Sequence, residues 1–110
     1  MLYGIAMAQP NPMTSDAVIS ELRTHAPELK QAGIRHIALF GSLARGEAGA
    51  DSDIDLVAEL DPGARIGLLR LIGLEQRLEE LLGRSVDLLA EPIEHPRLRA
   101  AVERDRRGAF

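Results

Sequence analysis

Two aspartates one residue apart carry the clearest chemical signal in this sequence. Asp53 and Asp55 open an apolar run that has the character of a β-strand. Because successive strand residues point to opposite faces, both carboxylates are expected on one face. Adjacent carboxylates repel each other unless a cation lies between them. Magnesium prefers hard oxygen ligands, so this pair predicts a magnesium site.

A glycine–serine pair precedes the two aspartates. Gly41 and Ser42 follow an earlier apolar run, and ten residues separate Ser42 from Asp53. Glycine lets the backbone turn sharply, and the N–H groups after it would open a short helix whose N-terminus favours a phosphate. Alone, this pair is better explained by a plain strand-to-helix connection. A phosphate site beside a magnesium site is what transfer from a nucleotide requires, so together the two motifs predict nucleotide chemistry.

Two other charged residues each have two interpretations. Arg45 either reaches a phosphate or forms a structural ion pair with Glu47 or Asp51. Asp87 stands alone among apolar neighbours in a further expected strand. A charge in a buried strand is unfavourable unless it is paired or binds a ligand, whereas an aspartate on an edge strand simply faces water.

The elements that position these residues follow from periodicity and turn signals. Residues 1–13 predict a flexible lead, and residues 14–110 a single α/β domain. We expect a helix capped by Thr14 or Ser15. Strands are expected over 34–40, 53–60 and 85–89, and helices over 66–82 and 97–107. The first two strands are joined by too few residues for a parallel crossover, so they should pair antiparallel.

Two apolar patterns in these elements have consequences for packing. Strand 34–40 is expected to be central, with both faces covered and with alternate residues on one face: Ile34, His36, Ala38 and Phe40. Helix 66–82 has an apolar stripe wider than a small core needs. The stripe is either entirely core or partly a surface for a partner.

Composition narrows the class of protein. A hydrophobic share of 45% in 110 residues is typical of one globular domain, and a net charge of −4 argues against direct nucleic-acid binding. The sequence has no cysteine, which excludes disulfides and fits a cytoplasmic location. No apolar run is long enough to span a membrane, and Met1 to Pro12 lacks a basic start, so we expect no membrane anchor or signal peptide.

The pair Gly41-Ser42, the ten-residue spacer and Asp53-Ile54-Asp55 resemble the GS-x10-DxD signature of the DNA-polymerase-beta-like nucleotidyltransferase superfamily. The Arg45-Gly46 pair and Ser52 also look like that family. The short chain resembles its minimal nucleotidyltransferase branch, the MntA-type antitoxins that work beside a HEPN-domain (HepT-type) toxin. The resemblance implies the nucleotidyltransferase fold, a small mixed β-sheet of about three or four strands flanked by helices.

The resemblance also implies roles for individual residues. Three carboxylates would be catalytic and would hold two Mg²⁺ ions: Asp53, Asp55 and Asp87. Four residues would bind the substrate ATP: Gly41, Ser42, Arg45 and Ser52. The implied activity is transfer of AMP from ATP to a tyrosine of a HEPN-domain RNase toxin, which silences the toxin.

Two alternatives remain at this stage. The chain could neutralise a toxin by binding alone, without chemistry, through the face of helix 66–82. It could also be an aminoglycoside-type nucleotidyltransferase that acts with a helper subunit. Larger relatives hold such an acceptor with an extra helical domain, for which the residues after Asp87 leave no room.

Overall fold

The structure is a computed structural model that describes residues 14–47 and 52–110. The expected lead, 1–13, and the loop residues 48–51, with Asp51 among them, lie outside the described residues. The elements follow one another in this order: α2 (Ser15–Thr24), α3 (Ala26–Gln31), β1 (Ile34–Phe40), α4 (Gly41–Ala44), β2 (Ile54–Leu60), the 3-10 turn η1 (Pro62–Ala64), α5 (Leu68–Leu82), β3 (Val86–Ala90), α6 (Pro96–Asp105) and β4 (Arg107–Gly108).

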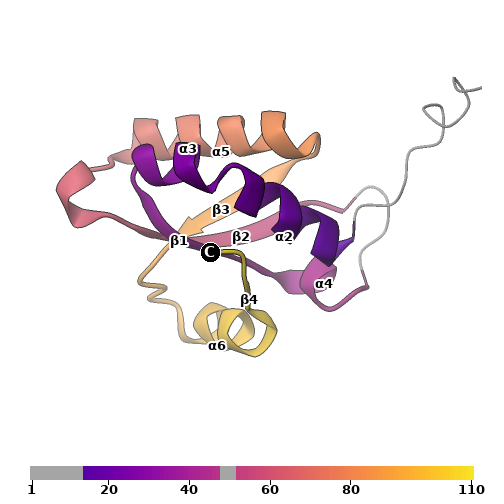
Figure 1. Ribbon diagram of the computed structural model, residues 1–110. Helices are drawn as coiled ribbons and strands as arrows, with labels where there is room; N and C mark the ends of the chain where they lie inside the picture. The colour runs from indigo at the N-terminus through magenta and orange to yellow at the C-terminus, as the bar shows by residue number, and fades with distance from the viewer. Residues whose placement is uncertain (1–13, 48–51) are drawn as a thin grey trace, which may run out of the picture.

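Four strands form one mixed sheet in the order β3-β2-β1-β4 (Figure 1). Strand β1 pairs antiparallel with both β2 and β4, and β2 pairs parallel with β3. The antiparallel pairing of the first two strands and the small mixed sheet are therefore confirmed. The parallel pair is joined through α5, the helical crossover that parallel strands require.

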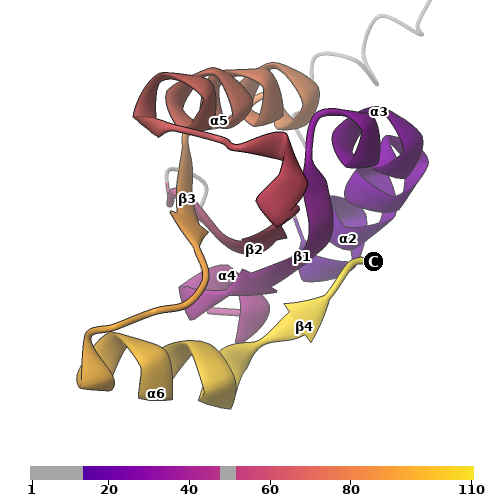
Figure 2. The ribbon, with the colours of Figure 1, turned by 90° about the vertical axis from the view of Figure 1, so that its left-hand side faces the viewer.

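Helices cover both faces of the sheet, which makes a three-layer domain (Figures 1 and 2). On one face α2, α3 and α5 pack on the sheet around the larger core, which contains Ile37, Leu39, Leu56 and Leu78. On the other face α6 packs against a smaller cluster around Phe40, Val57 and Val102. Strand β1 is therefore covered on both faces, as expected for a central strand.

The expected alternation along β1 is wrong at its first residue. Ile34 shares the larger core with Ile37 and Leu39, while Ala38 and Phe40 lie in the smaller cluster. The pairing with β2 shifts between Ile34 and His36, which marks a β-bulge. A bulge inserts an extra residue and so reverses the alternation on one side of it.

The helix ends follow local rules. The Thr14 side chain accepts a hydrogen bond from the Ala17 N–H, the expected N-cap of α2. Helix α5 begins at Leu68, two residues later than expected. Its far end is buried through Leu74, Leu78 and Leu82, whereas three apolar residues at its start are exposed: Leu68, Leu69 and Ile72. None of the helices within the described ranges is long and apolar enough to cross a membrane.

The last helix and the end of the chain differ from expectation. Helix α6 stops at Asp105 and not at residue 107, and Arg107–Gly108 form the short strand β4 beside β1. Ala109 is buried in the larger core, and its N–H donates to the Ile37 carbonyl. The sequence does not predict this strand, because a strand of two residues has no detectable periodicity.

Two glutamates of α5 close the outer edge of β3. The Glu79 carboxylate accepts from the Val86 N–H at 3.0 Å, and Glu75 accepts from the Leu88 N–H at 2.9 Å. These N–H groups alternate along β3 with those that face β2, so they point away from β2 at the outer edge of the sheet. An open edge strand is a template for pairing with another chain. The glutamates therefore satisfy the donors that such a chain would use.

We predict that the double variant Glu75→Ala, Glu79→Ala loses about 2 kcal/mol of unfolding free energy, because two partly buried N–H groups lose their acceptors. Urea denaturation measures the loss, and light scattering should show stronger self-association. The control Glu80→Ala breaks only an exposed ion pair with Arg77 and should change stability by less than about 1 kcal/mol. Equal stability of the two variants would contradict this role.

Candidate active site

The pairing of β2 with β3 sets Asp55 directly opposite Asp87. Ile54, Leu56 and Ala58 enter the larger core, so Asp55 points to the other face of the sheet, the side of α6. Asp53 lies immediately before β2 and two residues from Asp55. The structure therefore brings together the three carboxylates that the sequence singled out.

The charges of the neighbouring aspartates affect the pKa of Asp55. Burial raises the pKa of Asp55 above its ordinary value, and the negative charges of Asp87 and then Asp53 raise it further. The positive charge of Arg45 lowers it. Three carboxylates thus lie close to one another, and the negative charge of Asp55 is disfavoured at this position.

The sequence left open whether Asp87 lies in a buried strand or faces water at the edge of the sheet. Asp87 is exposed because β3 is the edge strand of the sheet, and Asp53 is exposed as well. The second of these readings, an edge residue that faces water, therefore agrees with the exposure of Asp87. It does not exclude a role at the site, because the same edge position keeps Asp87 beside Asp55 and open to a ligand.

The donor set can be tested against magnesium. Carboxylate oxygens are the ligands that magnesium prefers, and the raised pKa of Asp55 shows that this position favours added positive charge. In residues 14–47 and 52–110, however, no group of three or more histidine, aspartate or glutamate side chains is arranged to hold a metal ion. Strand register keeps Asp55 opposite Asp87, whereas rotation of exposed aspartate side chains readily changes the separation of their carboxylates.

Gly41 brings the turn after β1 against Asp55. Its φ of +78° belongs to the left-handed region, and a Cβ at this position would collide with the Asp55 carboxylate. Only glycine combines that backbone with so close an approach. Ser42 follows in the single helical turn α4, half-buried at the same end of the sheet. The predicted glycine–serine turn and the acidic pair are therefore in contact.

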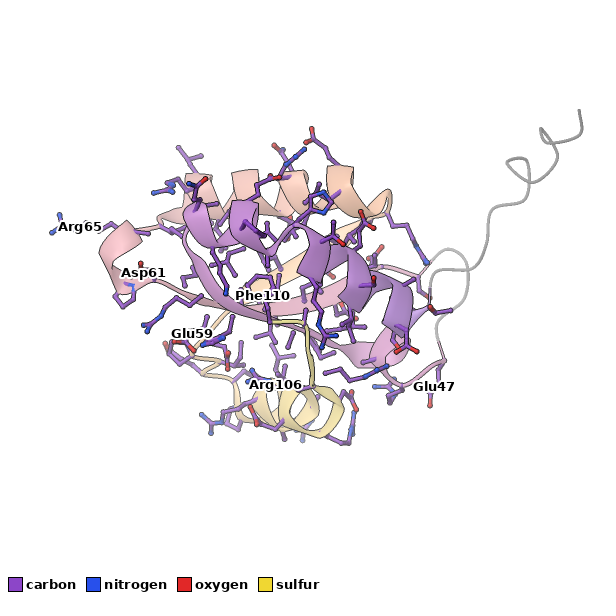
Figure 3. All side chains as sticks on the ribbon, in the orientation of Figure 1. Glu47, Glu59, Asp61, Arg65, Arg106 and Phe110 are labelled. Carbon is purple, nitrogen blue, oxygen red and sulfur yellow. The ribbon has the colours of Figure 1, made fainter. Side chains whose placement is uncertain are left out.

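Arg45, at the end of α4, forms the ion pair that the sequence offered as the alternative to phosphate binding. Its Nε donates to Glu47 at 3.0 Å, and its Nη1 donates to Asp105 at 2.7 Å. Figure 3 shows Glu47 at the end of the sheet that carries α4. The Asp105 contact ties the turn to α6, which packs against α4.

The sequence analysis missed Asp105, the C-terminal residue of α6. Its side chain is only 3% exposed. Hydrogen bonds from Arg104 and then from Arg45 hold its pKa below the ordinary value, although burial acts in the opposite direction. In the sequence, Asp105 is a single acidic residue among the basic residues 104–107. Such a pattern is typical of an exposed helix end with surface salt bridges, so it did not mark Asp105 as buried.

Ser52 lies at the entrance to β2. Its carbonyl oxygen accepts from Nη2 of Arg84 at 2.5 Å. Arg84 precedes β3, so this bond joins the starts of the two strands that carry the aspartates. The bond restrains the segment in which Asp53 lies.

Replacing Asp55 should stabilise the folded protein at neutral pH. A raised carboxyl pKa means that ionised Asp55 lowers stability above its folded pKa, and that this penalty is absent at pH values below the ordinary carboxyl range. We expect Asp55→Asn to melt about 2–5 °C above the wild type at pH 7, and the difference to vanish on acidification. Thermal scans across pH test this. The exposed control Glu94→Gln should leave the melting temperature unchanged both at pH 7 and in acid. A lower melting temperature for Asp55→Asn than for the wild type at pH 7 would refute the claim that the charge of Asp55 destabilises the fold.

Replacing Asp105 should have the opposite effect. Its lowered pKa means that ionised Asp105 stabilises the fold at neutral pH, and that this contribution is lost as the pH falls through the folded pKa. We expect Asp105→Ala to lower the melting temperature by several degrees at pH 7 and by less in acid. Glu47→Ala is the matched control, since it removes the exposed partner of the same arginine and should have little effect. Equal losses for the two variants would contradict a special role for the buried carboxylate.

A small mixed sheet that holds a glycine turn against two carboxylates on neighbouring strands defines a nucleotidyltransferase fold. Solved structures agree. A candidate minimal nucleotidyltransferase is 34% identical, covers 89% of this chain and 98% of its own, and superposes with a TM-score of 0.72. The MNT antitoxin complex with a tri-AMPylated HEPN toxin of Shewanella oneidensis, 19% identical over 84% of this chain and 71% of that one, has a TM-score of 0.60 and shows the fold alone.

Sequence comparisons define the family. The family model for the nucleotidyltransferase domain matches residues 19–108. The protein adenylyltransferase MntA of Thermococcus cleftensis is 42% identical over 78 residues, which are 70% of this chain and 77% of the relative. A candidate protein adenylyltransferase of Methanocaldococcus jannaschii is 42% identical over 86 residues, or 76% and 86% of the two chains. The chain therefore belongs to the nucleotidyltransferase domain family, in its minimal, MntA-type branch.

These findings confirm the predicted family, the predicted fold and the predicted class of enzyme, a nucleotidyltransferase. The roles assigned to individual site residues stay predictions. Among them, Arg45 is placed in ion pairs, and the three aspartates and Gly41 are placed at one end of the sheet.

Proposed function

We propose that this chain is an antitoxin that transfers AMP from ATP to a tyrosine hydroxyl of a HEPN-domain RNase toxin. The observation that carries the proposal is the placement of Asp55 opposite Asp87 with Gly41 against it. The names of relatives support the acceptor: one is the protein adenylyltransferase MntA, and one fold neighbour is a complex with a tri-AMPylated HEPN toxin. Another fold neighbour, a toxin–antitoxin structure with AMP-PNP, supports an adenine nucleotide as the donor.

The proposed reaction is a phosphoryl displacement. The tyrosine oxygen forms a bond to the α-phosphorus of ATP, the bond from that phosphorus to the β-phosphate oxygen breaks, and pyrophosphate leaves. The hydroxyl proton passes to a nearby base; we assign this role to Asp87, whose exposed position on β3 supports it. Asp53, Asp55 and Asp87 would hold two magnesium ions, which would neutralise the attacking and leaving oxygens.

The remaining predicted residues bind the leaving phosphates in this proposal. Gly41 and Ser42 would donate to the β- and γ-phosphates from the turn that lies against Asp55. Arg45 uses Nε and Nη1 for its carboxylate partners, so Nη2 is the donor proposed to meet a phosphate. Ser52 is proposed to contact the nucleotide from the entrance to β2.

Addition of AMP would silence a toxin by simple physics. Each AMP adds a negative phosphate and the bulk of a nucleoside to the tyrosine. Close to a groove that binds RNA, this group repels the RNA backbone and occupies its place. The proposal therefore needs the acceptor tyrosine to lie beside the RNase site of the toxin.

Asp55→Asn tests the chemistry. A neutral amide keeps the shape of the side chain but removes the central charge of the site, so we expect transfer to fall about 100-fold or more. The purified HEPN-domain partner is incubated with ATP and magnesium, and its intact mass is followed. Wild type and the control Glu94→Gln should add the mass of AMP. Transfer at the wild-type rate by Asp55→Asn would refute the assignment.

A second candidate function is neutralisation by binding alone, without transfer. The observation in its favour is the exposed apolar start of α5, where Leu68 and Leu69 are 72% and 84% exposed. A variant with all three aspartates changed to asparagine separates the two functions. If it neutralises the toxin with no change in the toxin's mass, binding suffices; if it fails although it still binds, transfer is required.

A further inference from the structure

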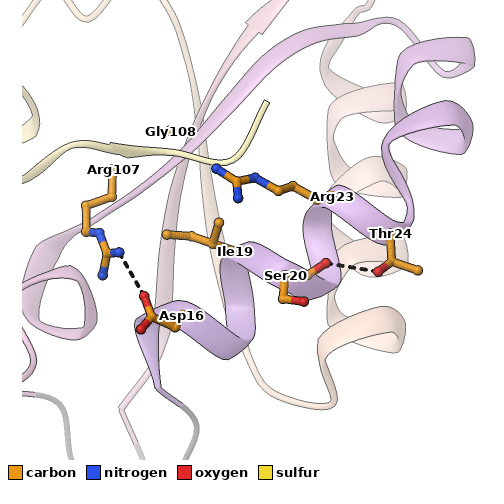
Figure 4. Close-up of a pocket in the computed structure, with 7 residues that line it drawn as sticks. All are labelled: Asp16, Ile19, Ser20, Arg23, Thr24, Arg107 and Gly108. Carbon is orange, nitrogen blue, oxygen red and sulfur yellow. Dashed lines mark hydrogen bonds and ion pairs between the residues drawn. The ribbon is translucent and has the colours of Figure 1, made fainter.

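The two edges of the sheet differ. Glu75 and Glu79 satisfy the outward N–H groups of β3, so that edge is closed. Beside β4, the other edge strand, lies a hollow of about 620 Å³ between the strand and α2, which Figure 4 shows. Seven residues line it: Asp16, Ile19, Ser20, Arg23, Thr24, Arg107 and Gly108. The volume is in the range of ligand-binding clefts.

The backbone of Gly108 opens into this hollow. In an antiparallel pair, hydrogen-bonded residues alternate with residues that face outward. The Ala109 N–H donates to the Ile37 carbonyl, so the neighbouring Gly108 directs its N–H and C=O away from β1. A Cβ at Gly108 would meet no atom within 4 Å among the described residues. The edge is therefore accessible at this residue.

Three cationic side chains lie close to the last residues of the chain. The Arg23 Nε donates to the Ala109 carbonyl at 2.7 Å, Lys30 lies 5.5 Å from the centre of the Phe110 ring, and Arg107 bonds Ser15 and Asp16. Within the described residues, only Arg107 of these three has a carboxylate in ion-pair distance. Three residues that line the hollow are charged, Asp16, Arg23 and Arg107, so the hollow has one positive charge in excess, in a chain whose net charge is −4.

The hollow lies two strands from the candidate active site, on the α2 side of the sheet, whereas Asp55 points to the α6 side. Arg107 lies opposite Leu39, one residue before Phe40, and Phe40 lies opposite Asp55. Two strand spacings of about 4.8 Å therefore separate β4 from β2. An extended chain advances about 3.3 Å per residue, so roughly three residues span that distance.

We propose that the hollow between α2 and β4 docks an extended, acidic segment of the acceptor protein. The segment adds to the free edge of β4: Gly108 donates its N–H to a carbonyl of the segment and accepts from one of its N–H groups. Arg23 contacts an acidic side chain of the segment. The acceptor hydroxyl lies more than three residues beyond the docked part, because the chain must cross two strand spacings and pass to the α6 side to reach the aspartates. This inference rests on the proposed function, since it supplies the site with its protein substrate.

Two peptides test the docking without any transfer reaction. A fluorescein-labelled decapeptide of alternating glutamate and valine, and its lysine–valine counterpart, are titrated with the protein and followed by fluorescence anisotropy. The acidic peptide should bind and shift the amide resonance of Gly108, and the basic peptide should not bind. Arg23→Glu should weaken binding about tenfold or more, because it places like charges together. The control Arg97→Glu makes the same charge change on the exposed outer side of α6 and should bind as the wild type does.

A second pair of variants guards against loss of the Arg23 bond to Ala109. Ser20→Glu adds a negative charge to the hollow and removes no side-chain hydrogen bond, and it should also weaken binding; exposed Ala100→Glu is its control. Equal binding by Ser20→Glu and Ala100→Glu would overturn the proposal. So would a shift of the Gly108 resonance by ATP alone, since the hollow would then be a nucleotide subsite.

The transfer assay separates this inference from the proposed function. Arg23→Glu should raise the KM for the protein acceptor and leave the KM for ATP unchanged, because the nucleotide residues are untouched. Asp55→Asn should bind the acidic peptide as the wild type does. If the wild type binds the peptide through Arg23 but transfers no AMP, the docking surface stands and the proposed function fails. If the wild type transfers AMP and Arg23→Glu changes neither binding nor KM, only the docking surface fails.

Discussion

The register between β2 and β3 fixes where the negative charge of this domain accumulates. Apolar residues set that register: Ile54 and Leu56 on one strand and Val86 and Leu88 on the other are buried in the larger core. A slip by one residue would turn every side chain of a strand to the other face. The free energy of burying these four residues therefore holds Asp55 and Asp87 together against their mutual repulsion.

Two carboxylates on the α6 side of the sheet experience opposite environments. Asp55 has acidic neighbours and a raised pKa, while Asp105 has two arginines and a lowered pKa. Arg45 connects them, because it bonds Asp105 directly and its charge reaches Asp55. The domain thus places its stabilising ion pair next to a site that is destabilised by charge. Local instability of this kind is common where a fold prepares for a charged ligand.

The sequence predicted the elements that have strong local signals. Apolar runs located three strands, the short spacer predicted the antiparallel pair, and Thr14 marked the start of α2. Sequence could not predict the bulge in β1, since nothing in the residue types there marks a change in pairing with β2. It also missed β4, whose position depends on contacts with β1 rather than on its own pattern.

The same division applies to the site. Motif spacing identified the glycine–serine turn and the acidic pair, because these residues lie close in the chain. The partner of Arg45 could not be found in this way, since Asp105 lies 60 residues further along and only the packing of α6 on α4 brings it near. The exposure of Asp87 also follows from strand order, which places β3 at the edge and which local sequence does not encode.

The long separation of Arg45 from Asp105 has a consequence for biosynthesis. A ribosome makes the glycine–serine turn well before it makes the carboxylate that anchors this turn to α6. During that interval Arg45 has the nearby Glu47 as its partner among the described residues, in an exposed pair that contributes little. The end of the sheet that carries α4 therefore acquires this anchor only after the ribosome has made the 60 residues that follow Arg45.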